Sequence, residues 1–532
     1  MNSITPHQLL GLIRDDQEIA IIDVREQGEF ANAHLLLSCC IPLSQLELRI
    51  AELVPRLDTR MVLIGNEPSD PYRRTHRAFE RLSQWGYTDL SILAGGIEGW
   101  RQTGFTLFSG VNTLSKAFGE FVENTYDTPR ITAQALWGKI KQGEDLVILD
   151  ARPAEEYHRM NIPGAFNVPG AELVYRFFDF VKDPGTLVVV NCAGRTRSII
   201  GAQSLINAGI PNPVVALKNG TMGWHLDGFD LENGQRRSAP FPTPAGMEQA
   251  KTCVRRVADR FGVKYVDPST VAEWQKDTGR RTLYLLDVRS PEEYSDGHLA
   301  GSRNAPGGQL VQATDEYVAV RNARVVLVDD IEIRATMTAS WLIQMGWKDV
   351  FVLSGGIGKD GLEKSPYHQR MITGCKESQG IFAAELNVML SAKSVAVIDV
   401  GTSRTYRNGH IPGAYWVIRS RIALDLAALS GFEQFVLTSP DDRLAHLAAE
   451  DLKAIRPDAA VRVLSGGTSA WKNAGFPIEK GMNRALSMVD DVRYKPYEQA
   501  TASEKAMTEY LDWEVGLVEQ IKKDGTVVFP RF

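Results

Sequence analysis

The hydrophobic positions of this chain follow one pattern that occurs four times. An apolar run ends in an aspartate in every copy, and these residues are Asp23, Asp150, Asp287 and Asp399. A glycine-rich turn follows, and its second glycine is Gly96, Gly220, Gly356 or Gly467. The two elements are about 70 residues apart in every copy, and so regular a spacing indicates one structural unit copied four times.

The apolar runs are short and apolar at nearly every residue, which is typical of parallel strands covered by helices on both faces. In the second copy we expect strands at 146–150, 165–169, 187–190 and 214–217, and a helix at 198–210. Strands that alternate with helices predict βα units. The predicted fold class is therefore α/β, with four tandem domains that each have a small central parallel sheet flanked by helices.

The repeat also predicts the domain boundaries. We expect the four domains at 1–110, 128–235, 263–372 and 373–482. Outside them lie a short helical connector at 111–127, a linker with a Pro-rich turn and a helix at 236–262, and a C-terminal tail at 483–532. The tail contains a candidate amphipathic helix. We expect it to pack back across the array, with an oligomerisation element as the alternative.

Composition and charge narrow the class of protein. The 532 residues carry a formal net charge of −6, which disfavours a nucleic-acid partner or a polybasic membrane surface. No apolar run is long enough to span a bilayer, and the first residues do not resemble a signal peptide. Five cysteines do not make a disulfide framework. We therefore expect a cytoplasmic protein.

Only the second copy has a cysteine, Cys192, between a buried strand and the following helix. The free amide groups and the dipole of a helix N-terminus form an anion site there. Gly194 allows the backbone to curl, Arg195 and Arg197 add positive charge, and Ser198 suits the first helical turn. These features predict a lowered pKa for the Cys192 thiol and a reactive thiolate.

The other cysteines carry no such signal. Cys39 and Cys40 lie in an apolar run and are predicted to be core residues. Cys253 and Cys375 lie in connecting segments without neighbouring glycine and arginine at loop spacing. No Cys/His pair has zinc-finger spacing, so we expect no metal.

The second copy resembles the rhodanese (sulfurtransferase) superfamily, and the likeness extends over about residues 1–480. In that family a D-x-R strand end, an H-[IL]-x-G segment and a G-G-x-x-x-W turn frame a six-residue loop that begins with the catalytic cysteine. The matching framing residues are Asp150, Arg152, Ile162, Pro163, Gly164 and Trp224. One departure is that the loop glycine, Gly194, lies two residues after the cysteine rather than three.

The resemblance implies a role for each loop residue. Cys192 would be the nucleophile, and the substrate-binding residues would be Ala193, Gly194, Arg195, Thr196, Arg197 and Ser198. Asp150 and Arg152 would support the loop as a buried pair, or else take part in sulfur transfer directly. Cys192 would take a sulfane sulfur from an anionic donor, thiosulfate or a persulfide, and pass it to a thiol or protein cysteine. No cofactor is expected, and a homodimer is possible.

The other copies lack sulfur at the matching junctions, where we expect Asn66, Asp329 or Asp330, and Ser439. They are predicted to be structural or partner-binding units. Two other functions were weighed. A scaffold without catalysis would explain the three altered loops. A phosphatase of the same fold would need a C-x5-R loop, whereas Cys192 and Arg197 are spaced C-x4-R.

Overall fold

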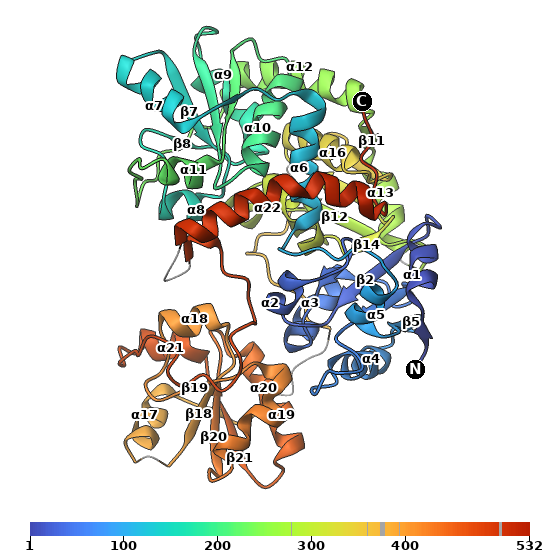
Figure 1. The fold of residues 1–532 in the computed structure, drawn as a ribbon, viewed down its shortest axis with the longest axis vertical. Helices are drawn as coiled ribbons and strands as arrows, with labels where there is room; N and C mark the ends of the chain where they lie inside the picture. Colours follow the sequence, from blue (N-terminus) through green and yellow to red (C-terminus); the bar gives the residue numbers. More distant parts are fainter. Residues whose placement is uncertain (278, 359, 373–377, 393, 499–502) are drawn as a thin grey trace.

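The computed structural model describes the chain except for residues 278, 359, 373–377, 393 and 499–502 (Figure 1). The described residues form four sheets, one for each copy of the repeat. The sheet of the second domain has the strand order β6-β10-β9-β7-β8, and every neighbouring pair is parallel. The third and fourth domains repeat this order. The predicted fold class is therefore confirmed.

The second domain contains the elements expected from its sequence. They are β6 (Arg130–Ile131), α7 (Ala133–Gln142), β7 (Leu146–Asp150), α8 (Ala154–Arg159), β8 (Phe166–Asn167), α9 (Glu172–Phe180), β9 (Leu187–Asn191), α10 (Thr196–Asn207), β10 (Val214–Leu217) and α11 (Gly220–Leu226). The central strands are buried because helices cover both faces of the sheet. The expected strand at 165–169 is only two residues long, and α10 begins before residue 198.

The first domain has the same unit at the start of the chain. Its elements are β1 (Ser3–Ile4), α1 (Pro6–Ile13), β2 (Ile19–Asp23), α2 (Gln27–Asn32), β3 (Cys39–Cys40), α3 (Leu46–Leu53), β4 (Met61–Ile64), α4 (Arg74–Gln84), β5 (Leu90–Leu93) and α5 (Gly96–Gln102). All five residues of β2 are buried. A strand with no exposed position needs cover on both faces, which explains its unbroken apolar run.

The third and fourth domains complete the array. The third contains β11 (Lys264–Val266), α13 (Pro268–Lys276), β12 (Leu283–Asp287), α14 (Pro291–Asp296), β13 (Arg303–Asn304), α15 (Gly307–Gln312), β14 (Val320–Arg321), β15 (Arg324–Val328), α16 (Ile333–Gln344) and β16 (Val350–Leu353). The fourth contains β17 (Gly380–Ile381), α17 (Ala383–Ser391), β18 (Ala396–Asp399), α18 (Ser403–Asn408), β19 (Tyr415–Trp416), α19 (Ile422–Asp425), β20 (Gln434–Thr438), α20 (Arg443–Ile455), β21 (Ala460–Leu464) and α21 (Gly467–Asn473).

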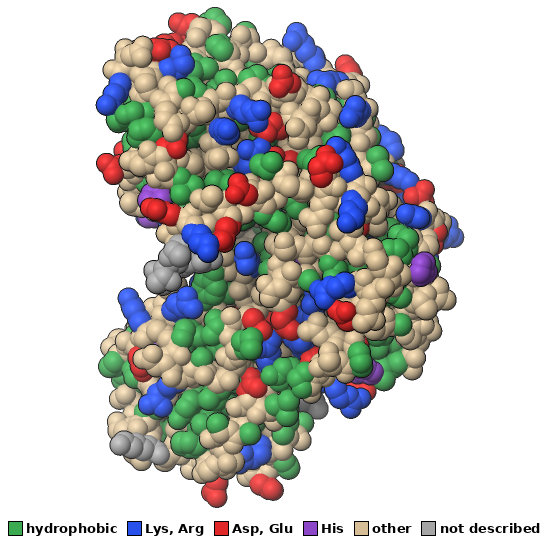
Figure 2. All heavy atoms as spheres, in the orientation of Figure 1, with side chains coloured by type: hydrophobic (Ala, Val, Ile, Leu, Met, Phe, Trp, Pro, Cys, Tyr) green, Lys and Arg blue, Asp and Glu red, His purple; other side chains and the backbone are tan. Residues whose placement is uncertain are grey.

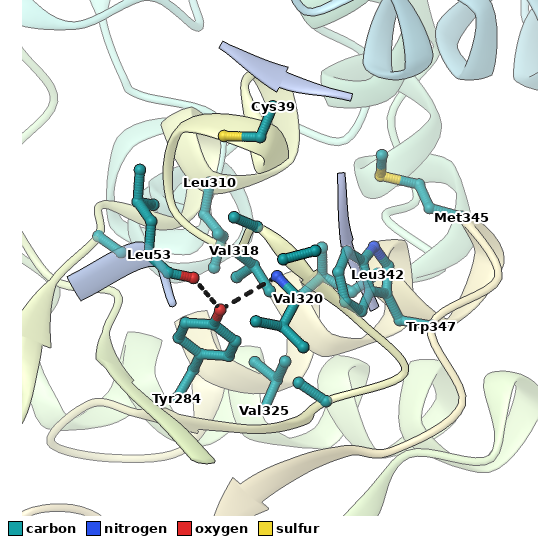
Figure 3. Close-up of a cluster of buried hydrophobic side chains, with 14 of the residues drawn as sticks. Cys39, Leu53, Tyr284, Leu310, Val318, Val320, Val325, Leu342, Met345 and Trp347 are labelled. Carbon is teal, nitrogen blue, oxygen red and sulfur yellow. Dashed lines mark hydrogen bonds between the residues drawn. The ribbon is translucent and has the colours of Figure 1, made fainter. Parts of the chain in front are cut away.

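The first and third domains share one hydrophobic core. Strand β14 of the third domain pairs antiparallel with β2 of the first and so extends its sheet. The Tyr284 hydroxyl donates to the carbonyl of Leu53 and accepts from the amide of Val320 (Figure 3). Apolar residues from both domains pack around it. The first and third domains therefore form one structural unit.

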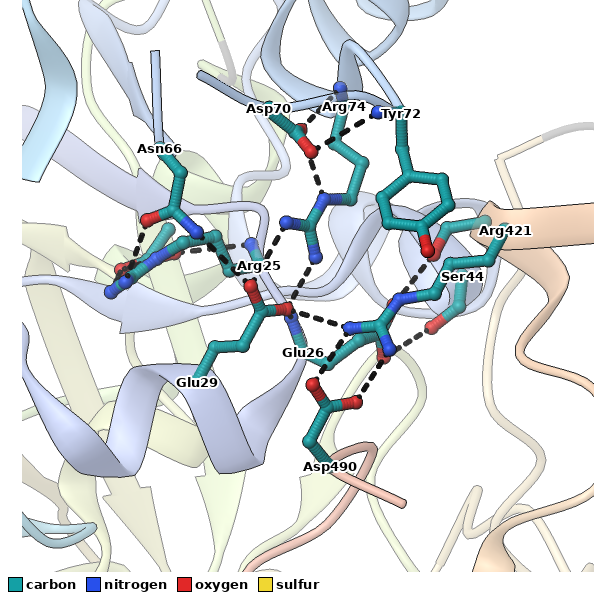
Figure 4. A network of polar contacts seen from close by, with 12 residues as sticks. Arg25, Glu26, Glu29, Ser44, Asn66, Asp70, Tyr72, Arg74, Arg421 and Asp490 are labelled. Carbon is teal, nitrogen blue, oxygen red and sulfur yellow. Dashed lines mark hydrogen bonds and ion pairs between the residues drawn. The ribbon is translucent and has the colours of Figure 1, made fainter. Parts of the chain in front are cut away.

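The fourth domain attaches to the first through charged side chains (Figure 4). Arg421 donates to Glu29 of the first domain and to Asp490 of the tail, at 2.9 Å each. Glu26, which is buried, accepts from Ser44 at 2.9 Å and from Ser420 at 2.8 Å. Such contacts are directional, and they fix the orientation of the fourth domain on the first.

Among the described residues, three α-helices lie outside the repeated units. They are α6 (Thr113–Tyr126), α12 (Pro244–Phe261) and α22 (Ser503–Asp524). Helix α22 packs against α6 and crosses the middle of the molecule beside the second domain (Figure 1). The surface is indented between the second domain, above, and the fourth, below (Figure 2). Among the described helices, none has the length and apolar character of a membrane span.

Candidate active site

The loop that follows β9 is held by the N-terminus of α11. The amides of Thr221 and Met222 donate to the carbonyls of Cys192 and Ala193, at 2.8 and 3.0 Å. Gly220 has a φ of +55°, and a Cβ there would lie 2.3 Å from the Cys192 carbonyl oxygen. Only glycine fits this position. The glycine-rich turn seen in the sequence therefore supports the cysteine loop directly.

The Cys192 side chain is buried, with 2% of the residue exposed. Its Sγ lies 3.6 Å from the hydroxyl of Ser198, which donates in turn to the carbonyl of Arg195 at 2.7 Å. Burial raises the pKa of the Cys192 thiol above its ordinary value, while the charge of Arg197 and the hydroxyl and amide of Ser198 lower it in part. The lowered pKa predicted from the sequence is therefore wrong in direction.

Arg197 lies beside the cysteine and forms a paired contact with the carboxylate of Glu156, at 2.9 and 3.1 Å. It also donates to Gln309 of the third domain at 3.3 Å. Glu156 accepts a second cation, since Lys495 of the tail lies 3.2 Å away. Two cations, Arg197 and Lys495, therefore share one carboxylate here.

Arg195 has a different environment from the one expected. Its guanidinium contacts Glu120 at 2.6 and 2.7 Å and Glu123 at 2.5 Å, both on α6. A third contact, at 3.2 Å, is with the side-chain oxygen of Asn219. Two carboxylates already match its charge. Arg195 therefore ties the loop to α6, and Arg197 is the better candidate for binding an anionic donor.

Asp150 and Arg152 form a fully buried ion pair at 2.7 Å. Arg152 also donates to the carbonyl of Met160 at 2.7 Å, and Asp150 accepts from Asn191 at 2.9 Å. Asn191 is the residue just before the cysteine. Because both charges are inaccessible, the contacts support the tethering role rather than direct chemistry.

The remaining predicted residues are packed against other parts of the protein. Ala193 is 8% exposed and Thr196 is buried against α6, where a Cβ at Gly119 would lie 2.8 Å from its Cγ2. Ile162 and Trp224 are core residues. Gly194 is buried, and a Cβ there would lie 3.1 Å from a carboxylate oxygen of Glu514. The loop therefore approaches α22 closely.

Cys192 opens onto a large cleft, called the central cleft below, with a volume of about 820 Å³. All four domains and the tail contribute to its walls. Residues that the sequence did not single out include Lys116 on α6 and Tyr510 and Glu514 on α22. For Tyr510 and Glu514 the only sequence signal was the amphipathic pattern of the tail, which does not say what the helix covers, and Lys116 had no signal beyond its place in the helical connector.

The remaining described cysteines differ in position. Cys39 is 3% exposed in the core, as predicted. Cys40 is partly buried and lines the central cleft, and burial raises its pKa well above the ordinary value. It is therefore a wall residue rather than a core residue. Cys253 is partly buried on α12, and Cys375 lies outside the described residues.

The model of the rhodanese-like domain matches four parts of the chain, at residues 5–103, 132–227, 267–359 and 382–474. Together they cover most of the sequence. The chain belongs to the rhodanese-like family. The matches include the Cys192 loop and its three counterparts without sulfur.

Solved and curated relatives of this rhodanese-like chain include sulfurtransferases. The crystal structure of a thiosulfate sulfurtransferase from Pseudomonas aeruginosa superimposes with a TM-score of 0.95 at 45% identity, covering 100% of this chain and 99% of that one. The 3-mercaptopyruvate sulfurtransferase of Escherichia coli is 26% identical over 251 residues, which are 37% of this chain and 86% of that protein. The full-length likeness supports a rhodanese-type sulfurtransferase, and a persulfide route is general in the family.

A shorter likeness concerns a single domain. The centrosomal protein of 41 kDa B from Xenopus laevis is 35% identical over 80 residues, which are 14% of this chain and 22% of that protein. This chain thus spans about a fifth of the length of that relative. The match reflects the domain family.

Backbone contacts establish which residue occupies the cysteine position in each rhodanese-like domain. In each domain, the amide of the first residue after β2, β7, β12 or β18 donates to a carbonyl at the end of the neighbouring strand. In domain order, these carbonyls belong to Ile64, Asn191, Val328 and Thr438. The next residues are Gly65, Cys192, Asp329 and Ser439, whose carbonyls all accept from the glycine-rich turn. The expected Asn66 is therefore wrong by one residue, and the choice in the third domain falls on Asp329. The loop of the first domain is longer, which hid the register in the sequence.

Oxygen atoms occupy the place of sulfur in two of these loops. Asp329 accepts from the amides of Glu332, Arg334 and Ala335, at 2.5, 2.8 and 3.2 Å. Ser439 accepts from the amide of Ala445 at 3.2 Å. The amides of these loops therefore donate to the side chain of Asp329 or Ser439, which cannot carry a sulfane sulfur.

Proposed function

We propose that the protein is a sulfurtransferase that carries a sulfane sulfur on Cys192 and uses thiosulfate as donor. The observation that carries the proposal is the position of Cys192, which is the one thiol at the cysteine position of the four described loops and opens onto the central cleft. The full-length likeness to a thiosulfate sulfurtransferase supports it. The reaction follows a two-step, ping-pong route.

In the first step the Cys192 thiolate attacks the outer sulfur of thiosulfate. The new S–S bond forms as the S–S bond of the donor breaks, and that electron pair leaves with sulfite. In this proposal Arg197 and the first amides of α10 stabilise the oxyanion of the donor. In the second step a thiolate acceptor takes the outer sulfur, and the electron pair returns to Cys192.

The loop composition favours this donor. Mercaptopyruvate-using relatives tend to have C-G-[SA]-G-V-T, whereas this loop reads C-A-G-R-T-R. The charge of Arg197 beside Cys192 suits an anionic donor. Thiosulfate or a persulfide is therefore the proposed donor, and the loop residues 193–198 are the proposed binding site.

The acceptor is proposed to be a thiol or a protein cysteine. A cleft of about 820 Å³ has room for a small thiol compound or for the end of an extended peptide. A cytoplasmic location would keep Cys192 reduced between turnovers. A homodimer stays a prediction, as do the domain boundaries given by the repeat.

Mass spectrometry after incubation with thiosulfate tests the proposal. An adduct of one sulfur atom is expected on wild type and absent from Cys192→Ser. Cys40→Ser is the matched control, since Cys40 lines the same cleft, and it should keep the adduct. A protein without any adduct, and without turnover on any sulfane donor, would instead be the scaffold that the three altered loops suggest.

A further inference from the structure

Formation of the persulfide requires a proton acceptor that the loop itself does not provide. Cys192 is buried as a thiol, so its proton must leave before the sulfur can attack. Arg195 and Arg197 are permanent cations and cannot accept it. The Ser198 hydroxyl accepts from the Cys192 thiol at 3.6 Å and donates to the carbonyl of Arg195, but a hydroxyl is too weak a base to keep the proton. A base for this proton is therefore sought among the carboxylates of the cleft wall.

Glu514 on α22 is the carboxylate positioned for this role. It is 2% exposed and lines the central cleft together with Cys192. Its Oε1 accepts from the hydroxyl of Tyr510 at 2.9 Å and from that of Thr196 at 3.4 Å. Its Oε2 has no hydrogen-bond partner among the described residues. A buried carboxylate oxygen without a partner is costly, which points to a partner that arrives with the reaction.

The unpartnered oxygen faces the catalytic loop. Glu514 Oε2 lies 3.1 Å from the place where a Cβ on Gly194 would be. A side chain at residue 194 would therefore press on the carboxylate. The glycine two residues after Cys192, the one departure from the family pattern, leaves room for Glu514.

Charged groups from three elements surround this carboxylate. Lys116 and Glu120 face it from α6, and Arg195 faces it from the loop. Tyr510 adjoins it on α22, and the charge of Glu514 is felt at Cys192. Burial and Glu120 raise the pKa of Glu514 to about 7, while Lys116, Tyr510 and Arg195 oppose the rise. A group with such a pKa can both accept and return a proton near neutrality.

We propose that Glu514 takes the proton of Cys192 when the persulfide forms and returns it when the persulfide is discharged. This role rests on the proposed function. In the first step the Cys192 thiol, the Glu514 carboxylate and thiosulfate give the Cys192 persulfide anion, the Glu514 carboxylic acid and sulfite. In the second step the acceptor thiolate takes the outer sulfur, and Glu514 protonates the released Cys192 sulfur.

A purely electrostatic role makes the opposite prediction. A negative charge near Cys192 disfavours the thiolate and repels an anionic donor. If Glu514 did nothing more, its neutralisation would speed persulfide formation. If it carries the proton, neutralisation must slow that step. The sign of the effect therefore separates the two roles.

The experiment measures single-turnover persulfide formation from thiosulfate as a function of pH in the full-length protein. For wild type we expect the rate to rise through an inflection near the pKa of Glu514, about 7. For Glu514→Gln we expect a rate about 10²-fold lower at neutral pH, the usual scale for loss of a general base. The inflection should be absent, and the rate should recover at the higher pH where Cys192 ionises unaided.

Glu509→Gln is the matched control, because Glu509 lies on the same helix and lines the same cleft but is exposed. Its rate and pH profile should equal those of wild type. A Glu514→Gln rate equal to or above wild type would overturn the inference. So would a wild-type profile with no inflection near neutrality, a test that does not depend on any variant folding. Failure of wild type to form a persulfide at any pH would instead refute the proposed function.

Discussion

The loops of the second and third domains share a backbone but differ in what occupies it. The amide six residues after the cysteine position belongs to Ser198 in one and to Ala335 in the other. In the second domain this amide donates to the Cys192 sulfur. In the third domain it donates to the carboxylate of Asp329 at 3.2 Å. An anion-binding loop has therefore been kept in both, and in the third domain its own carboxylate fills it.

The arginines of the two loops show the same contrast. Arg197 contacts Glu156 and the neutral Gln309, whereas Arg334 contacts three carboxylates at 2.8 Å, and these are Glu172, Glu293 and Asp330. The contacts are reciprocal, because Arg197 reaches the third domain and Arg334 reaches the second. The charge of Arg334 is therefore matched by more carboxylates than the charge of Arg197. The loop of the third domain and the Cys192 loop are thus linked by contacts between their two domains.

The largest expected effect comes from replacing Cys192 by the residues found at the same position in the third and fourth domains. Cys192→Asp and Cys192→Ser should both lower thiosulfate:cyanide sulfurtransferase activity by more than about 10³-fold, since neither oxygen can hold a sulfane sulfur. Cys192→Asp should fold, because the carboxylate would accept the loop amides as Asp329 does. Steady-state assays and circular dichroism give the two readings. Residual activity near wild type would place the sulfur on another cysteine.

Replacing single arginines by alanine should separate an effect on donor binding from an effect on stability. Arg197→Ala should raise the KM for thiosulfate by roughly 10–100-fold, since it removes a charged hydrogen bond to the donor. Arg195→Ala should have a smaller effect on KM, because Glu120 and Glu123 already occupy that side chain.

Arg334→Ala should leave KM unchanged but cost about 3–5 kcal/mol of stability, because it strands carboxylates around a buried site. Kinetics and urea unfolding measure both effects. The contrast between the loops would fail if Arg334→Ala changed KM as strongly as Arg197→Ala.

A cysteine introduced into the loop of the third domain should restore very little sulfurtransferase activity. Asp329→Cys in a Cys192→Ser background should recover below about 1% of activity, because Asp330 follows the new thiol directly and would repel both thiolate and thiosulfate. Adding Asp330→Ala copies the residue that follows Cys192 and should recover more. Rates near wild type with Asp329→Cys alone would show that the charge around Asp329 does not silence this loop.

The smallest expected effect is a pH dependence of stability at Asp329. Burial raises its pKa from 3.8 to about 6. A raised carboxyl pKa contributes stability that is present below the unfolded value and is lost as the pH rises through about 6. Asp329→Ser copies the residue of the fourth domain, so it should cost about 1–3 kcal/mol more at pH 4–5 than at pH 8. Equal costs in urea unfolding at both pH values would contradict the shift.

Local pattern was enough to predict the four α/β domains and the position of the cysteine loop between β9 and α10. The unbroken apolar runs, such as that of β2, report strands buried on both faces. The junction at Cys192 and the turn at Gly220 are fixed within one domain, by hydrogen bonds between neighbouring segments. Such features depend on residues whose separation recurs in every copy, so the repeat made them visible.

The tertiary structure decided what surrounds the thiol. Burial raises the pKa of Cys192. Helices α6 and α22 contact its loop at Thr196 and Gly194, and Glu120 rather than a donor binds Arg195. Glu514 lies more than 300 residues from Cys192 in the chain, as the Thr196 contact shows. The pKa of a group depends on burial and on every charge within a few ångströms, whatever the place of the neighbouring residues in the sequence. The sequence by itself determined which loop holds the thiol, and the packing of distant helices decided which charged groups surround that loop.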